Sequence, residues 1–388
     1  MVSKKDDQQT NAPTTPPMGS YVPTADDKQQ KNMLIHPATQ DLADYQASWL
    51  DGTKPFRGLA TGLQDIDQAI GGLDRFVLLA GRSGAGKTTL ALQFAQGILK
   101  RGTPVVIYSY EMARGEILTS LLKLEAHDLV ATQDPTNKPP YTHLHTNTIE
   151  LRGNDPALQA DYRKTIDDAM QSLNSTVERL YIRDSQTGIL PILPPSKTAR
   201  AKDTPIDAKQ DAKPSMLDDI EYVKHGAGTQ DVLVIVDSVQ DIVATNNPNQ
   251  VQAEIEAVND LTRLQQMTGA TILVTAQKNK GSVNSTDSYG DVMGSMSFIH
   301  KPNTALELVT VAEVVNKLPQ SERARYQQEV RDLEADAKRD FAKPMLLNVI
   351  KGRFTGTGSL PLMFYGAWGY FDTKADPNYK DMYSILER

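Results

Sequence analysis

Cysteine is absent from the 388 residues of the sequence. Its absence excludes disulfides, thiolate zinc sites and cysteine nucleophiles. Long apolar runs are also lacking: the strongest, such as Val232 to Val236, are far shorter than the roughly 20 residues that span a bilayer. The first residues, MVSKKDDQQT, contain no apolar signal segment. We therefore expect a cytoplasmic protein with no membrane contact.

Positive charge is in deficit, because 41 Lys and Arg residues stand against 48 Asp and Glu residues, a formal net charge of −7. This balance excludes the uniformly basic surface of a histone-like DNA-binding protein, so any contact with nucleic acid must use a local basic lining. Hydrophobic residues make up 39% and charged residues 23% of the sequence, which is typical of a globular protein with one large or two ordinary domains.

Both ends of the sequence differ in character from its middle. Residues 1–32 are rich in Gln, Pro, Thr and charge, which predicts a disordered tail. In the linker 33–57, Leu42, Tyr45 and Trp49 have the spacing of one apolar stripe on a short helix. The stripe needs a partner surface, either its own domain or a neighbouring subunit. A second tail is expected at 373–388.

Residues 58–372 alternate between strand and helix patterns, which predicts an α/β fold: a mostly parallel sheet with helices on both faces. The later strand runs follow one another closely enough to form antiparallel hairpins. The strand runs are Phe76 to Ala80, Val105 to Ser109, Leu180 to Arg183, Val232 to Val236, Thr271 to Val274, Ala305 to Val311, Met345 to Ile350 and Leu360 to Phe364. The helical patterns are Glu116 to Ala126, Asp155 to Leu173 and Gln252 to Met267.

Two insertions interrupt this alternation. Residues 186–228 begin with a stretch rich in Pro, Lys and Asp, and we expect most of the insertion to be a mobile surface excursion. Residues 321–341 instead space their apolar side chains as one stripe of an amphipathic helix. Its use stays open between a partner surface and a decoration of the domain.

Residues 81–88, GRSGAGKT, match the phosphate-binding pattern G-x-x-x-x-G-K-[ST] at every position. A buried strand pattern precedes them and a helix pattern follows, so backbone N–H groups and the helix N-terminus would face phosphate. Lys87 is expected to neutralise the β and γ phosphates, and Thr88 to offer its hydroxyl to Mg²⁺. The alternative is a chance glycine-rich turn. The predicted ATP-binding residues are Gly81, Arg82, Ser83, Gly84, Ala85, Gly86, Lys87, Thr88 and Thr89.

Two acidic residues are candidates for the chemistry of hydrolysis. Asp237 ends the apolar run VLVIV, and ligands of open α/β sheets bind at the carboxyl ends of strands, so we expect it to hold Mg²⁺ with Thr88. Many P-loop ATPases place a glutamate next, but here Ser238 follows. Glu111, at the end of VVIYSYE, is therefore the candidate that activates water. A helix or turn cap for Asp237 and a solvated strand end for Glu111 are the alternatives.

Several segments together resemble the RecA-like motor domain of DnaB-type replicative helicases, over roughly Phe56 to Asp372. In the family's order they are TGLQDIDQAIGGL, GRSGAGKTT, SYEM, LYIRDS, LVIVDSVQDI, TILVTAQKNK and IKGRFTGTG. The resemblance implies that Glu111 activates water, that Asp237 serves Mg²⁺ and that Gln277 senses the γ-phosphate. It also implies that Lys351 and Arg353 reach into the ATP site of a neighbouring subunit. ATPase sites would then lie between subunits of a ring, a hexamer.

In the family, DNA contacts come from loops that face the central channel, and the corresponding region here is Gln277 to Ser297. The resemblance therefore assigns DNA binding to Lys278, Asn279 and Lys280, repeated around the ring. Met293, Gly294 and His300 depart from the family's pattern and predict weak or backbone-mediated contact in the second loop. Residues 1–55 are not expected to form the family's N-terminal collar, which puts collar-based recruitment of primase in doubt.

The resemblance implies a helicase driven by ATP and Mg²⁺ that moves 5′ to 3′ on single-stranded DNA during replication. A compact helicase of this kind suits a phage or plasmid system, and a primase or a loader is a candidate partner. The alternative is a RecA- or RadA-like switch, which assembles on DNA when ATP binds and does not unwind it. The altered second loop and the insertions favour the switch, whereas the KGR and SYEM segments favour the motor.

Overall fold

The computed structural model describes residues 42, 56–133, 156–188, 190–194, 214–242, 249–278, 300–339, 342–366 and 368–373. The chain divides into two units, Met1–Lys54 and Pro55–Arg388. Leu42, in the first unit, is helical and exposed. Tyr45, Trp49, the predicted tail 1–32 and residues 374–388 of the second predicted tail lie outside the described residues.

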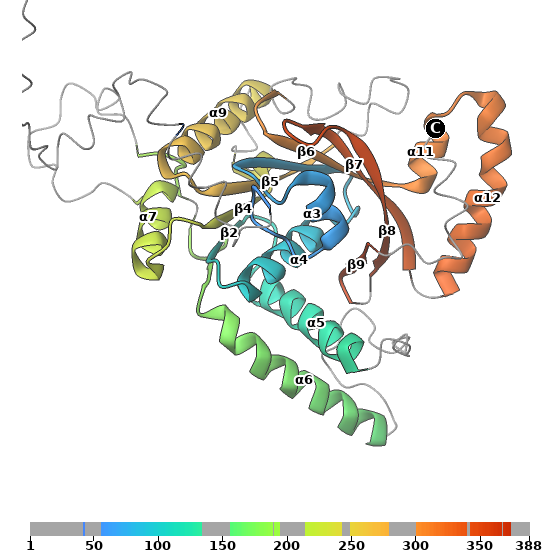
Figure 1. Cartoon of the computed structure of the whole chain (residues 1–388), viewed down its shortest axis with the longest axis horizontal. Coiled ribbons are helices and arrows are strands. Elements are labelled where there is room, and N and C mark those ends of the chain that lie inside the picture. The colour runs from blue at the N-terminus through green and yellow to red at the C-terminus, as the bar shows by residue number, and fades with distance from the viewer. Residues whose placement is uncertain are drawn as a thin grey trace, which may run out of the picture. The chain divides into compact units, whose positions relative to one another are not determined.

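A nine-stranded sheet forms the centre of the second unit, in the order β3-β2-β4-β5-β1-β6-β7-β8-β9 (Figure 1). The strands from β3 to β6 in this order run parallel, and β7, β8 and β9 add antiparallel pairs at one side. The predicted mostly parallel sheet with late hairpins is thus confirmed. The bounds are β1 Phe76–Gly81, β2 Val105–Ser109, β3 Leu180–Arg183, β4 Leu233–Asp237, β5 Thr271–Gln277, β6 Thr304–Thr310, β7 Ala342–Gly352, β8 Gly358–Tyr365 and β9 Tyr370–Asp372.

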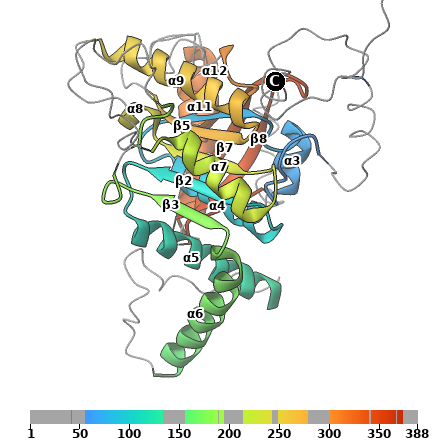
Figure 2. The same cartoon turned by 90° about the vertical axis from the view of Figure 1, so that its left-hand side faces the viewer.

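Helices cover both faces of the sheet, because successive side chains of a buried strand point to opposite sides. Along β1, Val77 and Leu79 pack in the cluster that includes α4, α5 and α6, whereas Leu78 and Ala80 pack with α7 and α9. Figure 2 shows α6 beside α5 and extending away from the sheet. The helix bounds are α3 Gln64–Ile70, α4 Lys87–Lys100, α5 Arg114–Gln133, α6 Pro156–Val177, α7 Met216–Ala227, α8 Val239–Ile242, α9 Gln250–Thr268, α11 Val311–Lys317 and α12 Gln320–Arg339.

Helix α7 corrects the interpretation of residues 186–228 as mostly a mobile excursion. Met216 and Ile220 are fully buried and pack with the core cluster under α9. A capping box fixes the start of the helix, because Ser215 and Asp218 each accept a hydrogen bond from the other's backbone N–H. The last part of the insertion therefore belongs to the core, while 195–213 lie outside the described residues.

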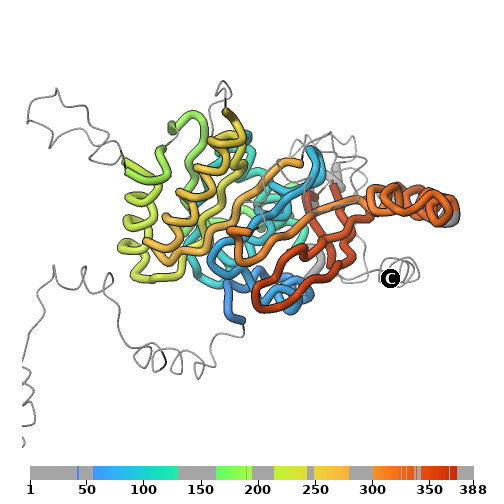
Figure 3. Tube along the Cα trace, turned by 90° about the horizontal axis from the view of Figure 1, so that it is seen from above, coloured from blue at the N-terminus to red at the C-terminus, as the bar shows by residue number. Residues whose placement is uncertain are grey.

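The amphipathic helix predicted at residues 321–341 is confirmed as α12, Gln320–Arg339. Its apolar stripe is used within the chain, since Val330 and Leu333 are buried in one cluster with Val315 of α11 and Leu346 of β7. Figure 3 shows α11 and α12 at the end of this unit opposite α7. The apolar stripe of α12 therefore packs against the sheet through a small separate core.

Candidate nucleotide site

The loop between β1 and α4 has the backbone conformation that the phosphate-binding pattern requires. Gly84 and Gly86 adopt φ angles of +73° and +89°, in the left-handed region that favours glycine. A Cβ atom at Gly86 would also lie 2.8 Å from Cζ of Phe371. Helix α4 begins directly after this glycine, at Lys87. Glycine is thus needed at Gly86 both for conformation and for space.

The two predicted Mg²⁺ ligands are in contact. Thr88 Oγ1 donates a hydrogen bond to Asp237 Oδ2 at 2.7 Å, and the Thr275 hydroxyl donates to the other oxygen, Oδ1. The contact follows from the order β4-β5-β1, which brings the carboxyl ends of these strands to one edge of the sheet. Thr275 was not predicted. The signal for it was a hydroxyl residue inside the apolar strand TILVTAQ, two positions before Gln277.

The charge of Asp237 acts on both Lys87 and Glu111. Burial lowers the pKa of the Lys87 ammonium, against the opposing effect of the Asp237 and Glu111 charges. Partial loss of hydration and the charges of Asp237 and Asp241 raise the pKa of the exposed Glu111 carboxyl, and Lys87 opposes the rise. The Lys87 ammonium donates to the Arg82 carbonyl oxygen at 3.1 Å. The structure thus brings Glu111 to the same edge as the loop.

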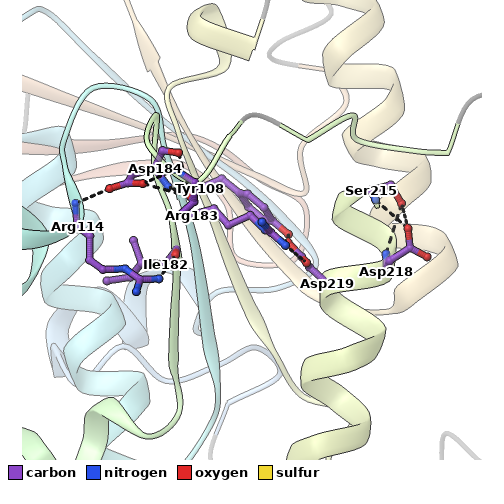
Figure 4. A network of polar contacts seen from close by, with 9 residues as sticks. Tyr108, Arg114, Ile182, Arg183, Asp184, Ser215, Asp218 and Asp219 are labelled. Carbon is purple, nitrogen blue, oxygen red and sulfur yellow. Dashed lines mark hydrogen bonds and ion pairs between the residues drawn. The ribbon is translucent and has the colours of Figure 1, made fainter. Parts of the chain in front are cut away.

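Polar contacts fix the segment that connects Glu111 to α5. The Arg114 backbone N–H donates to Asp184 Oδ2 at 2.9 Å, and its guanidinium donates to the Ile182 carbonyl at 2.6 Å (Figure 4). In the same network, Asp219 of α7 accepts from Arg183 of β3 and from the Tyr108 hydroxyl of β2. Glu111 therefore follows a rigid strand and precedes an anchored helix start.

Gln277 is the last residue of β5 and lies beside Gly81, the last residue of β1. Its backbone oxygen accepts a hydrogen bond from Gln240 Nε2 at 3.0 Å, while its side chain is exposed. The predicted phosphate-sensing residue is thus next to the phosphate-binding loop.

Lys351 and Arg353 lie at the opposite edge of the sheet. The Arg353 N–H donates to the Asn303 carbonyl at 3.0 Å, and the Asn303 N–H donates to the carbonyl of Phe76, the first residue of β1. The length of β1 puts about 16 Å between this edge and the phosphate loop. Lys351 Nζ donates to the His300 carbonyl at 2.6 Å. The structure therefore does not bring these two cations to the loop of their own chain.

Lys278 is placed differently from its predicted role in DNA binding. Its ammonium forms an ion pair with Glu307 of β6, and the two residues are only 8% and 2% exposed. Releasing this amine to a phosphate group would leave the Glu307 carboxylate buried and unpaired, which is costly. The other two predicted DNA contacts, Asn279 and Lys280, lie outside the described residues, as do Met293 and Gly294.

Strand β9 supports the helix that carries the phosphate loop. Gln93 of α4 donates to the Phe371 carbonyl and accepts from the Phe371 N–H, both at 2.9 Å. The Phe371 ring stacks on Phe364 of β8 with 4.5 Å between centroids. Because Phe371 and Trp368 are buried, the aromatic residues at the end of the domain serve core packing. Neither β9 nor the Gln93 contact was predicted.

Two features are absent from the described part of the chain: a membrane-spanning helix and a metal site made by protein groups alone. None of its helices is long and apolar enough to cross a membrane. Within the same residues, no three His, Asp or Glu side chains gather as a metal site made by protein groups alone. Thr88 and Asp237 suit Mg²⁺, which binds through few protein ligands and completes its shell with water and substrate phosphate.

Comparisons with known sequences point to one family. Residues 58–148 match the family model of the DnaB-like helicase C terminal domain. The replicative DNA helicase DnaB of Leifsonia xyli subsp. xyli (strain CTCB07) is 33% identical over 98 residues, which cover 24% of this chain and 19% of the relative. A probable replicative DNA helicase of Trieres chinensis is 26% identical over 140 residues, which cover 35% of this chain and 30% of the relative. The matches thus span less than a third of either relative.

Solved structures extend the likeness over most of the chain. One of them, an ATPase domain, aligns with a TM-score of 0.57 at 15% identity and covers 87% of this chain and 99% of that domain. The structure of a DnaB-like replicative helicase and its interactions with primase aligns with a TM-score of 0.58 at 16% identity, covering 87% and 67%. The resemblance to DnaB-type helicases is therefore confirmed: the chain has the RecA-like fold of their ATPase domains, and its residues 58–148 match the DnaB-like helicase C-terminal family.

Proposed function

We propose that the chain is an ATP-hydrolysing DNA helicase that works as a ring of identical copies in DNA replication. The observation that carries this proposal is the grouping of Lys87, Thr88, Asp237 and Glu111 at the carboxyl edge of a RecA-like sheet. The family match of residues 58–148 gives this grouping its context.

Each residue of the grouping has a chemical task in this proposal. The backbone of the glycine loop and the Lys87 ammonium would bind the phosphates of ATP, and Thr88 and Asp237 would hold Mg²⁺. Bound ATP supplies the phosphoryl group that is transferred to water. Glu111, with its raised pKa, would accept the proton of the attacking water, and Gln277 would contact the γ-phosphate from the neighbouring strand.

The position of Arg353 supports a ring. Its edge of the sheet is remote from the phosphate loop of the same chain, so Arg353 and Lys351 would serve the loop of a neighbouring copy. An arginine supplied to the γ-phosphate in this way is worth about 10³ to 10⁵ in rate. A head-to-tail contact that closes on itself forms a ring, and the family resemblance suggests a hexamer that moves 5′ to 3′ on single-stranded DNA.

A RecA- or RadA-like switch remains the second candidate because of Lys278. Its burial against Glu307 removes one of the cations that the motor interpretation assigned to DNA. A protein that assembles on DNA when ATP binds, and hydrolyses ATP slowly, does not have to move along the DNA. It would therefore need fewer DNA contacts that change with each hydrolysis step. Primase and loader proteins are candidate partners of the motor only.

The motor would separate the strands of duplex DNA, whereas the switch would not. We would measure ATP hydrolysis with and without single-stranded DNA, and unwinding of partial duplexes that carry either a 5′ or a 3′ single-stranded tail. The motor predicts strong stimulation by DNA and unwinding that depends on the tail, both lost in Lys87→Ala. Arg263→Ala, on the exposed face of α9, is the control and should behave as wild type. ATP-dependent assembly on DNA without unwinding would support the switch.

A further inference from the structure

Helix α11 contacts the phosphate loop through an ion pair. Arg82 Nε lies 2.7 Å from Oε1 of Glu313, in the first turn of α11. The second carboxylate oxygen, Oε2, accepts the Thr310 N–H at 2.8 Å, and Thr310 Oγ1 accepts the Glu313 N–H at 3.1 Å. This capping box fixes the carboxylate, so Glu313 presents one oxygen to Arg82 from a rigid position.

Arg82 is well placed to bind a phosphate group as well. It belongs to the loop itself, and its carbonyl oxygen is the acceptor of the Lys87 ammonium. A guanidinium offers several donors in a plane and binds phosphate in a two-pronged manner. The Arg82 side chain is 48% exposed whereas the Glu313 side chain is 17% exposed, so Arg82 can turn toward another anion without repacking the core.

We propose that Glu313 is a positioning residue that sets nucleotide affinity by holding the Arg82 guanidinium on α11, where the carboxylate competes with the phosphates for this cation. The proposal rests on the proposed binding of ATP at the loop. Because coupling between two contacts is reciprocal, a nucleotide that draws Arg82 away must also weaken the attachment of α11 to the loop. Helix α11 thereby becomes sensitive to the nucleotide state.

The central test is Glu313→Gln, which removes the charge but keeps an oxygen for the Thr310 N–H. Equilibrium binding would be measured with a fluorescent ATP analogue and with ADP, in the presence of Mg²⁺. An ion pair that is partly exposed contributes little, so we expect the dissociation constant to fall about two- to five-fold. Glu334→Gln, on the exposed face of α12, is the matched control and should leave binding unchanged.

The same substitution must have no effect in the background of Arg82→Ala, because the cation for which Glu313 competes is then absent. This comparison separates positioning from a loss of structure. Damage to α11 would weaken binding in both backgrounds. Glu313→Asp provides a second variant if Glu313→Gln does not fold: it keeps a charged cap but withdraws the carboxylate from Arg82, and it should also tighten binding.

Hydrogen exchange tests the reciprocal effect without any measure of activity. In wild type, the amides of residues 311–317 should exchange faster when ATP or ADP is bound, and in Arg82→Ala the nucleotide should leave their exchange unchanged. Unaltered affinity in Glu313→Gln and Glu313→Asp, or a gain that persists with Arg82→Ala, overturns the proposal. If wild type binds no nucleotide, or Lys87→Ala binds equally well, the proposed function itself fails.

Discussion

The carboxyl group of Glu111 lies in a field of negative charge, which predicts how ATP hydrolysis depends on pH. Loss of hydration, Asp237 and Asp241 raise its pKa, so Glu111 takes up a proton at a higher pH than an ordinary glutamate. As a base it works only when ionised, and kcat/KM should fall as the pH drops through this raised pKa. Asp241→Asn removes one negative neighbour and should move the acid limb to lower pH.

The measurement is the pH profile of kcat/KM for ATP in wild type and in Asp241→Asn. Asp65→Asn, on the exposed side of α3, is the control that keeps the profile of wild type. An acid limb that stays in place in Asp241→Asn would show that another group limits the rate.

The buried pair of Lys278 and Glu307 predicts a large loss of stability when one partner is removed. Lys278→Met leaves the buried Glu307 carboxylate without its cation, which costs about 3–5 kcal/mol. Adding Glu307→Leu should recover most of this loss, because two apolar side chains then fill the site. Denaturant unfolding of the single and double variants measures both steps.

The double variant also separates the structural role of Lys278 from DNA binding. If the ion pair is its whole role, the double variant binds single-stranded DNA with the affinity and salt dependence of wild type. A weaker affinity with a shallower salt dependence would mean that the ammonium contacts phosphate after all.

At the scale of single residues, sequence predicts the parts of the site that a local pattern defines. The glycine loop, Lys87 and Thr88 follow from one contiguous motif, and Asp237 follows from its place after an apolar run. The contacts of Thr275 with Asp237 and of Glu313 with Arg82 could not be predicted, because each contact joins two separate elements. For the same reason the ion pair of Lys278 with Glu307 was not predicted: Glu307 lies on β6, across β1, and no local pattern connects the two residues.

At the scale of elements, the buried face of α7 predicts a marked effect of truncation. Ile220 is fully buried and packs with the strands of the core, so Ile220→Ala should lower the free energy of unfolding by about 2–5 kcal/mol. Tyr222 on the same helix is 73% exposed, and Tyr222→Ala should change stability by less than about 0.5 kcal/mol. Denaturant unfolding compares the two. Equal small effects would restore the view of this segment as a surface excursion.

The elements that the sequence predicted well have a strong pattern of their own. Each of the eight apolar runs overlaps one observed strand, and α5, α6 and α9 overlap their predicted helices. Helix α7 was missed because the Pro-rich stretch before it dominated the interpretation of the insertion. The capping residues Ser215 and Asp218 were the signal for its start. Strand β9 has only three residues, too few for a pattern, and is held by Gln93 of α4.

At the scale of the whole molecule, the two edges of the sheet carry the two sets of residues that the proposed ring would bring together. The carboxyl edge has the phosphate loop with Thr88 and Asp237, whereas the opposite edge has Arg353. Arg353 of one copy is therefore too far from the phosphate loop of the same copy to contact it. In the proposed head-to-tail ring each loop would meet the far edge of the next copy, so the number of complete sites would equal the number of interfaces.

This division predicts that two inactive variants restore activity when mixed. Lys87→Ala has no working loop but a normal Arg353, and Arg353→Ala has the reverse. Where an Arg353→Ala loop meets a Lys87→Ala neighbour, a complete site forms. In a random ring with head-to-tail contacts, about a quarter of the interfaces are of this kind, so the mixture should regain up to about a quarter of the wild-type ATPase rate.

Each variant alone should be far slower, because an arginine at the γ-phosphate is worth about 10³ to 10⁵ in rate. The matched control mixes Arg353→Ala with the double variant Lys87→Ala/Arg353→Ala. That mixture contains no arginine at position 353 and must stay inactive, although its rings have the same assembly. If the mixture of single variants hydrolyses ATP only at the average of its two components, Arg353 does not complete a neighbour's site, and the ring would need another source for that cation.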